Sequence, residues 1–229
     1  MKLCAAGDEA RTTREARKKM ATPKKLTRAE QKALRPIQIL DAAFEEFVRS
    51  GFSGTRVEDI AERVNVTKGT VYVYFETKEK LFEAMIHHFS VPFQELLETA
   101  EGLSGSATDR LLSILGLLYE QIAEDRTTRE LTRLVISEGQ RFPDLIDRHH
   151  DEFIAPIIAK VDGLILEGVA SGEFRAIPVE FSDIVVAPIL TTTVLRLIFD
   201  DRREPPPNKE AFLRAYFDLL LHGLLAKPH

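Results

Sequence analysis

Residues 56–75 (RVEDIAERVNVTKGTVYVYF) constrain the fold more than any other stretch of this chain. Apolar residues recur there at three- and four-residue spacing, which predicts a helix of about two turns. These residues are Val57, Ile60, Ala61 and Val64. Asn65 and Val66 then form a turn, and Thr67 is placed to cap a second short helix over 68–75. Two short helices joined by a tight turn are typical of a helix-turn-helix.

The rest of the chain has the same helical spacing, with no strand-like alternation of useful length and no internal repeat. We therefore predict an all-α fold of about nine helices. Further helices are expected over 36–51, after a Thr77 cap, and over 108–125, 128–139, 143–170, 181–200 and 209–225. Pro92 should kink or interrupt the helix that Thr77 caps.

Three regions follow from this pattern. Residues 1–26 are predicted to be a basic, flexible extension, 27–76 a three-helix helix-turn-helix domain, and 77–229 a larger C-terminal helical domain. Thr27 and Glu30 match a capping box, and Pro36 suits the first turn of a helix. Gly51 should close that helix, and Thr55 should cap the next one.

The net charge of −5 hides an asymmetry between the two ends of the chain. Residues 1–89 hold 17 Lys and Arg against 13 Asp and Glu, whereas residues 90–229 hold 14 against 23. A basic first third beside an acidic remainder suggests that one end binds nucleic acid. The ten cations between Arg11 and Arg35 are either a solvated tail or an arm that adds phosphate contacts, and both readings stay open.

Several classes of protein and site are disfavoured by the same sequence. No apolar stretch reaches the ~18 residues of a membrane span, and the N-terminus lacks the apolar core of a signal peptide, so we expect a cytoplasmic protein with no membrane partner. Cys4 is the only cysteine, which excludes an internal disulfide. We expect no metal and no cofactor, because the adjacent histidines 87–88 and 149–150 would point about 100° apart on a helix.

A helix in the major groove of DNA holds its first residues nearest the base edges and phosphates. Thr67 can offer its hydroxyl and the helix amides to a phosphate, and Lys68 supplies positive charge. Gly69 removes a side chain where the backbone comes close to DNA, although tight packing between helices explains it nearly as well. Residues 67–75 therefore have the chemistry of a recognition helix.

Further residues on this helix and beside it are predicted to contact DNA. Thr70 and Tyr72 should point hydroxyls outward, and Val73 can touch a thymine methyl. Tyr74 offers a second phenol or instead buttresses the domain. The flanking phosphates are expected to be held by Thr55 and Arg56 before the preceding helix and by Lys78 after the recognition helix.

Over 39–85 the chain resembles the TetR family of bacterial transcriptional regulators. The resemblance is carried by the apolar positions and by Gly51–Phe52, Thr55, Ile60–Ala61, Val66, Lys68–Gly69–Thr70, Tyr72, Tyr74–Phe75, Lys78 and Leu81–Phe82. The segment 172–175 is similar too. The basic extension is longer than the family usually carries, and position 73 varies widely in it, so the operator sequence cannot be read from Val73.

The resemblance implies a homodimeric repressor with a nine-helix subunit. Both recognition helices would bind a palindromic operator, and a small molecule entering the C-terminal half would release it. Two-fold symmetry places the half-sites about 34–36 Å apart or a multiple of this distance. On this reading residues 77–229 form the ligand-binding and dimerisation domain, and the helix after Thr77 is the element expected to move.

The last two predicted helices are apolar on more than one face, which favours burial against a second copy over simple core burial. The predicted dimer interface consists of Val194, Leu197, Ile198, Phe212, Tyr216, Leu220 and Leu224. Candidates for lining an effector pocket lie on the middle helices, although each also suits an ordinary core. They are Leu115, Leu118, Tyr119, Ile122, Leu134, Glu138, Phe153, Ile157 and Val161.

Two other classes of function compete with a ligand-responsive DNA-binding dimer. One is a helical binding or scaffold protein whose helix-turn-helix never meets DNA, and the other is a helical enzyme with an apolar cavity. The sequence has no glycine-rich phosphate loop and no arrangement of Ser, His and Asp that indicates a nucleophile and its base. We therefore predict that the chain is not an enzyme.

Overall fold

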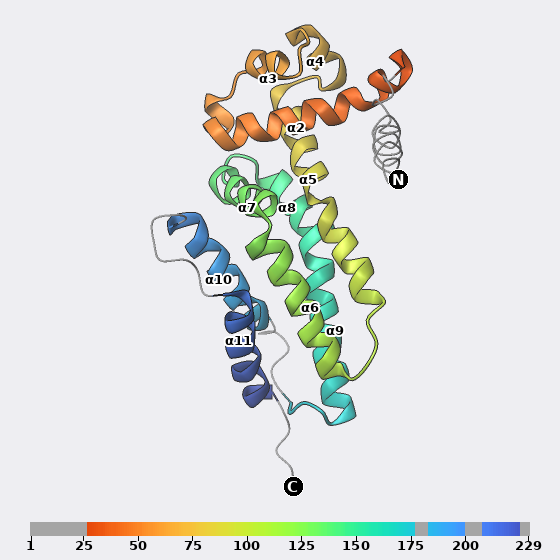
Figure 1. Ribbon diagram of the computed structural model, residues 1–229, viewed down its shortest axis with the longest axis vertical. Helices are drawn as coiled ribbons and strands as arrows, with labels where there is room; N and C mark the ends of the chain where they lie inside the picture. Colours follow the sequence, from red (N-terminus) through yellow and green to blue (C-terminus); the bar gives the residue numbers. More distant parts are fainter. Residues whose placement is uncertain (1–26, 177–182, 200–207, 225–229) are drawn as a thin grey trace, which may run out of the picture. The chain divides into compact units, whose positions relative to one another are not determined.

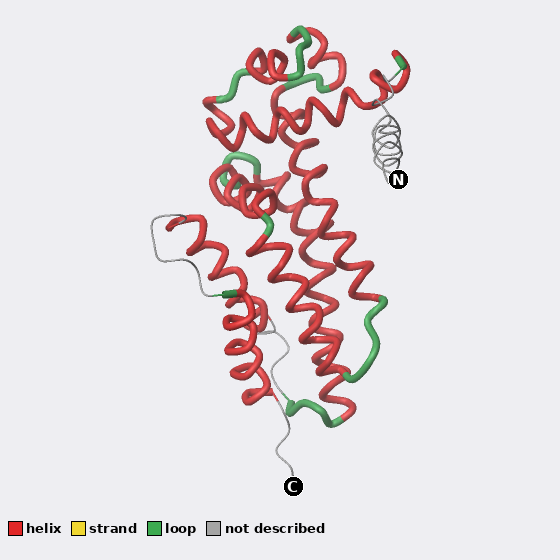
Figure 2. The backbone as a smooth tube through the Cα atoms, in the orientation of Figure 1, coloured by secondary structure: helices red, strands yellow, loops and turns green. Residues whose placement is uncertain are grey.

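The computed structural model describes residues 27–176, 183–199 and 208–224. Over these ranges the regular elements are helices, and no strand occurs among them (Figures 1 and 2). The predicted all-α class is therefore confirmed. The chain divides into two compact units, residues 1–38 and 39–229. The predicted extension at 1–26 lies outside the described residues.

Successive helices fill the described ranges with short connections. They are α2 (Arg28–Gly54), α3 (Val57–Arg63), α4 (Lys68–Tyr74), α5 (Lys78–Glu101), α6 (Ala107–Tyr119), the π-helical turn η1 (Glu120–Glu124), α7 (Arg126–Glu138), α8 (Pro143–His149), the π-helical turn η2 (His150–Ile154), α9 (Ala155–Ser171), α10 (Asp183–Phe199) and α11 (Lys209–Leu224). Because α8, η2 and α9 are continuous, they count as one helix, and the described residues then contain the nine predicted helices.

The first described helix starts earlier than predicted. Thr27 N donates to Glu30 Oε2 at 2.7 Å and Glu30 N donates to Thr27 Oγ1 at 3.2 Å, which is the predicted capping box. Helix α2 begins directly after this box and continues through Pro36, so the predicted start at Pro36 is wrong. The proline removes one hydrogen bond from the helix without ending it.

The end of α2 is set by Gly51, whose φ of 67° lies where residues with a side chain are strained. The regular helix therefore ends at Gly51 as predicted, and a further turn follows before α3. The prediction that Thr55 caps α3 is wrong, because Arg56 is the N-cap residue and no side chain caps that helix. Thr55 Oγ1 lies instead 2.9 Å from Glu46 O and 2.8 Å from Gly51 O.

The first hydrophobic cluster of the unit 39–229 joins residues of α2 to α5 with α7 and α8. At its centre the rings of Phe47, Phe52 and Phe82 lie with centroids 5.0–5.8 Å apart. Leu131 and Leu145, from α7 and α8, belong to the same cluster. The helix-turn-helix segment therefore shares its core with the start of the C-terminal region.

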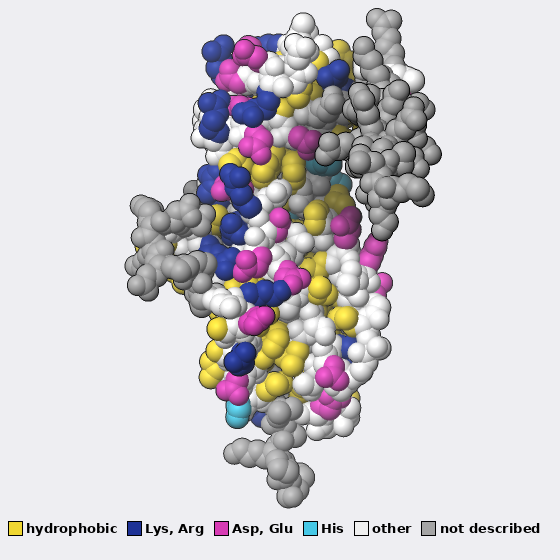
Figure 3. Space-filling model, viewed as in Figure 1, with side chains coloured by type: hydrophobic (Ala, Val, Ile, Leu, Met, Phe, Trp, Pro, Cys, Tyr) yellow, Lys and Arg dark blue, Asp and Glu magenta, His cyan; other side chains and the backbone are white. Residues whose placement is uncertain are grey.

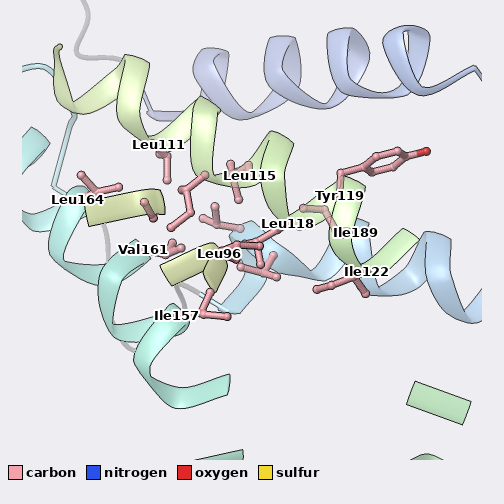
Figure 4. Packing of buried hydrophobic residues seen from close by; sticks show 14 of the residues in the cluster. Leu96, Leu111, Leu115, Leu118, Tyr119, Ile122, Ile157, Val161, Leu164 and Ile189 are labelled. Carbon is pink, nitrogen blue, oxygen red and sulfur yellow. The ribbon is translucent and has the colours of Figure 1, made fainter. Parts of the chain in front are cut away.

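The second hydrophobic cluster of this unit lies among α5, α6, α9, α10 and α11. Figure 4 shows Leu111, Leu115 and Leu118 of α6 facing Val161 and Leu164 of α9, with Leu96 of α5 between them. Each of these side chains is less than a tenth exposed. This cluster forms the core of the C-terminal helices.

Two predicted helices contain π-helical turns. The expected helix over 143–170 widens at η2, which ends two residues before Pro156. Proline has no N–H and its ring clashes with the carbonyl one turn earlier, so a wider turn accommodates it. At η1, Asp125 N donates to Glu120 O at 3.0 Å, and the Asp125 carboxylate then caps α7 by accepting from Thr128 N at 2.7 Å.

Helix α5 leaves the helix-turn-helix segment as one long helix. Its predicted cap is confirmed, because Thr77 Oγ1 accepts from Lys80 N at 3.0 Å. Pro92 lies inside this helix and does not interrupt it. Among the described residues no helix is both long enough and apolar enough to cross a membrane.

Candidate nucleic-acid interface

Helices α3 and α4 form the predicted helix-turn-helix. The turn between them depends on Asn65, whose φ of 53° is in the left-handed region that Asn tolerates. Val66 N closes the turn by donating to Ala61 O at 2.9 Å. On α4, Val71 is 1% exposed and Val73 is 80% exposed. The helix therefore buries one face in the first cluster and leaves the other free.

The start of α4 is capped as predicted. Thr67 Oγ1 accepts from Thr70 N at 3.2 Å and lies 3.0 Å from Thr70 Oγ1. The Thr67 side chain is exposed, and that of Thr70 is half-buried. The two hydroxyls thus lie together at the exposed end of the helix.

Two cations of this surface, Arg56 and Lys68, have a carboxylate partner within the chain. Lys68 Nζ donates to Glu58 Oε1 at 2.8 Å, and Arg56 Nε lies 4.0 Å from Glu58 Oε2. The hydrogen bond to Glu58 raises the pKa of Lys68, and the same bond lowers the pKa of Glu58. Figure 3 shows this mixture of dark-blue cations and magenta carboxylates over the helices labelled α3 and α4 in Figure 1.

The structure separates the two readings of Gly69. A Cβ at this position would meet only Thr67 Oγ1, at an ordinary 3.7 Å, so tight helix packing does not require a glycine here. Tyr72 and Tyr74 are half-buried and pack against the first cluster. Both tyrosines therefore support the domain with their rings, and the roles predicted for their hydroxyls stay predictions.

Two further predicted DNA contacts have unexpected surroundings. Thr55 is 2% exposed and its hydroxyl faces backbone carbonyls, so this side chain cannot hold a phosphate, which corrects the prediction. Lys78 is half-buried, with Nζ 4.6 Å from the centre of the Phe52 ring. Burial lowers the pKa of Lys78, and the nearby charge of Arg141 lowers it further.

A buried carboxylate that sequence reasoning missed holds α2 against α3. Glu46 is 3% exposed, and its Oε1 accepts from Arg63 Nε at 3.0 Å while its Oε2 accepts from Arg49 Nε at 3.1 Å. Burial acts to raise the pKa of Glu46, but the hydrogen bonds and charges of the two arginines outweigh it and lower the pKa. The signal was a charged residue directly before Phe47, within the apolar stripe of α2.

The candidate effector residues fall into two sets. Seven of them are at most 6% exposed and belong to the second cluster, which makes them packed core in this structure. They are Leu115, Leu118, Tyr119, Ile122, Phe153, Ile157 and Val161. Leu134 belongs to the first cluster instead, and Glu138 Oε1 accepts from Phe52 N at 3.0 Å. The prediction that these last two residues line a pocket with the others is therefore wrong.

A hollow of about 310 Å³ lies between α5 and the α8–η2 stretch. Phe153 is the one predicted pocket residue among those that line it. His149 lies at its edge, with Nδ1 3.1 Å from Ser90 Oγ. Burial lowers the pKa of His149, and the neighbouring His150 lowers it further. A second hollow, of about 620 Å³, lies between α5 and the η1–α7 stretch.

Helices α10 and α11 carry exposed apolar side chains. Val194 is 39% exposed, Ile198 is 49% exposed, and Leu219, which was not among the predicted interface residues, is 75% exposed. Figure 3 shows apolar surface in the region of α11. Phe212 and Leu220 pack partly against the second cluster, and Leu197 is half-buried. The side chain of Leu224 lies outside the description.

Tyr216 was also predicted for this face, but it is 7% exposed within its own chain. Its hydroxyl donates to Val185 O, and burial raises its pKa well above the usual value. Tyr216 therefore joins α10 to α11 and does not offer its ring to a second copy.

The fold and this surface define a helix-turn-helix protein with an exposed recognition helix and a helical C-terminal domain. Residues 39–85 match the family model described as bacterial regulatory proteins, tetR family. A relative 23% identical over 195 residues is the fatty acid metabolism regulator protein of Bacillus subtilis, of which 97% is covered, together with 85% of this chain. Over residues 39–85 the chain is thus similar to the tetR family of bacterial regulatory proteins, and the likeness to this relative extends over most of its length.

Solved structures share the fold at lower sequence identity. The regulator FadR of Bacillus subtilis in complex with stearoyl-CoA has a TM-score of 0.65 at 22% identity, over 82% of this chain and 98% of that one. A transcriptional regulator of Saccharomonospora viridis in complex with choline has a TM-score of 0.70 at 17% identity, over 85% and 100%. These structures extend the likeness beyond the matched segment into the C-terminal helices.

Proposed function

We propose that this protein is a transcriptional repressor that binds a palindromic operator as a homodimer and releases it when a small molecule binds. The main support is helix α4, which buries Val71 and leaves Thr67, Lys68 and Val73 exposed. An amphipathic helix with hydroxyls, a cation and an apolar side chain on its free face can reach phosphates, base edges and a thymine methyl in the major groove. The bacterial cytoplasm is where such a protein would meet DNA.

Exposed apolar side chains on α10 and α11 support the homodimer. Val194, Ile198 and Leu219 expose apolar surface to water, and contact with another apolar surface would bury it. A second copy of the same helices is therefore their proposed partner. Two helices from each chain would then form a four-helix bundle with two-fold symmetry. That symmetry is what would match a palindromic operator.

A hydrophobic effector is proposed for the C-terminal helices. The second cluster is almost wholly apolar, so a ligand that entered among these helices would have to be largely apolar too. Stearoyl-CoA, which occupies a protein of the same fold, is the first candidate to test, and choline, which occupies another, serves as a small cationic comparison. An effector must bind the two states of the dimer unequally, and a coupling of ~1–3 kcal/mol would change operator affinity about 5- to 150-fold.

The test starts with selection of bound duplexes from random DNA. We expect a palindromic consensus with half-sites about one helical turn apart. If Arg56, Lys68 and Lys78 reach phosphates in both subunits, six contacts give a log–log dependence of affinity on salt with a slope of about −5. Failure to enrich any sequence, or binding that ignores salt, would contradict the proposal.

The effector is tested on the selected duplex. Stearoyl-CoA is titrated against the complex, with choline and free coenzyme A as comparison ligands. Release by stearoyl-CoA alone would assign a long-chain acyl effector. Release by choline would assign a small cationic one, and no release by any of the three would reject these candidates and leave DNA binding intact.

A further inference from the structure

The final turn of α2, from its kink at Gly51 to Gly54 (residues 51–54, here the α2–α3 connection), is held by the bend between α7 and α8 (residues 138–142, the α7–α8 bend). Glu138 Oε1 accepts a hydrogen bond from Phe52 N at 3.0 Å, and Arg141 Nη1 donates to Ser53 Oγ at 2.7 Å. The partners are 86 and 88 residues apart in the sequence. These bonds therefore tie the helix-turn-helix to the C-terminal helices at a point other than α5.

The Phe52 ring strengthens the same attachment. It is 2% exposed, and its centre lies 4.5 Å from the Arg141 guanidinium carbon and 4.7 Å from the centre of the Phe142 ring. One turn earlier, Arg133 Nη2 of α7 donates to Val48 O at 2.6 Å. The α7–α8 bend and α7 thus hold both the last turn of α2 and the residues that follow it.

Two of these contacts are made to the backbone. Glu138 binds a backbone amide and Arg133 binds a backbone carbonyl, so moving either side chain moves the main chain of α2 itself. Gly51 fits this arrangement, because its positive φ turns the chain and a Cβ there would lie 3.3 Å from Glu138 Oε1. If α5 were the only connection, the helix-turn-helix could rotate about the axis of α5. A second attachment away from that axis restricts this rotation.

The attachment also reaches the helices of the proposed dimer face. Helix α7 contacts α10, which carries the exposed Val194 and Ile198. A chain of packed elements therefore runs from α10 through α7 and its bend to the α2–α3 connection, and from there to α3 and α4. We propose that Glu138 and Arg141 are positioning residues for DNA recognition, which set the place and angle at which each α4 meets its half-site. This inference rests on the proposed function, in which a dimer binds DNA through the helix-turn-helix of each subunit.

The experiment measures how strictly the protein selects the spacing between half-sites. The probes are the palindromic duplex selected from random DNA and two derivatives with one base pair inserted or removed at the centre, which rotates one half-site by about 35° relative to the other. The wild type should bind the derivatives about tenfold more weakly or worse. In the double variant Glu138→Ala, Arg141→Ala this penalty should fall below about threefold, because the helix-turn-helix of each subunit could then rotate to fit either spacing.

Matched variants distinguish positioning from simple loss of structure. Glu138→Gln keeps a carbonyl oxygen for the Phe52 amide and should restore most of the spacing selectivity when Arg141 is intact. Asp144→Ala changes an exposed carboxylate just beyond the bend and should behave as the wild type. Thermal unfolding and circular dichroism are followed for every variant.

Each outcome bears on the inference. Loss of spacing selectivity with the helical signal retained supports it. A double variant that keeps the tenfold penalty overturns it, as does one that weakens binding to all three duplexes equally. If the wild type bound all three duplexes equally well, the proposed binding of a dimer to two half-sites would be overturned as well. Only in that case would the proposed function fail together with the inference.

Discussion

Replacing Glu46 by glutamine removes the buried charge that joins α2 to α3 while keeping the shape and helix propensity of the side chain. The new side-chain amide could still accept from one arginine, but its NH2 group would face the other. Hydrogen bonds to charged groups contribute about 1.5–3 kcal/mol each. The Arg49 and Arg63 side chains are 62% and 45% exposed, so water compensates for much of the loss. We therefore expect a loss of about 1–2 kcal/mol in the free energy of unfolding.

Urea unfolding at pH 7, followed by circular dichroism, measures this loss. With an m value of about 3 kcal/mol/M, the midpoint should fall by about 0.5 M. The pH dependence is a second readout, because the pKa of Glu46 is lower in the folded state than in the unfolded chain. Its stabilisation is fully present above about pH 4.3 and is lost as the pH falls through the folded pKa. The difference between wild type and variant should therefore shrink in acid.

A result that would refute this reasoning is an unchanged midpoint at pH 7, or a difference that grows as the pH falls. Glu46→Leu is the informative comparison. It removes the carboxylate but fills the site with apolar atoms, and the two exposed arginines can turn to water. A near-neutral effect of the leucine variant beside a clear loss with the glutamine variant would assign the cost to the unsatisfied polar contacts.

Three further predictions concern the proposed recognition helix, the proposed dimer face and the half-buried His149. Tyr72→Phe should weaken operator binding about threefold to tenfold in a gel-shift titration and leave the melting temperature unchanged; equal loss of both would make the hydroxyl structural. Val194→Glu should convert the dimer to monomers in sedimentation, and an intact dimer would reject the proposed face. His149 has a pKa lowered by burial, so the folded state resists protonation and loses stability as the pH falls below about 6.5. His149→Gln should flatten the fall in melting temperature between about pH 7.5 and 5.5, and an unchanged slope would contradict this origin.

The sequence predicted best what depends on near neighbours in the chain. The Thr67 and Thr77 caps, the turn at Asn65 and the end of the regular helix at Gly51 each involve residues within a few positions, and all four are present. The apolar spacing of the longer helices gave their positions for the same reason. Helical periodicity is a local property that packing preserved here.

The errors arise where distant residues decide. Thr55 looked like a cap, but its hydroxyl lies against the carbonyl of Glu46, nine residues away in α2. Glu138 looked like part of an apolar pocket, although its partner is the amide of Phe52. Spacing identifies the buried face of a helix but not which of two cores that face meets. Leu134 illustrates this limit, because its burial was foreseen and its cluster was not.

The pairing of Lys68 with Glu58 has a consequence for the search along a chromosome. In the free protein the Lys68 ammonium group already pairs with a carboxylate, so approaching a phosphate exchanges one anion for another and brings Glu58 towards the negatively charged backbone. We therefore expect weaker attraction to duplex of arbitrary sequence and shorter dwell times away from the target. Removing the carboxylate with Glu58→Gln should strengthen binding to random-sequence DNA more than binding to the selected site. Discrimination between the selected site and other DNA would then depend partly on Glu58, whose charge repels the phosphates.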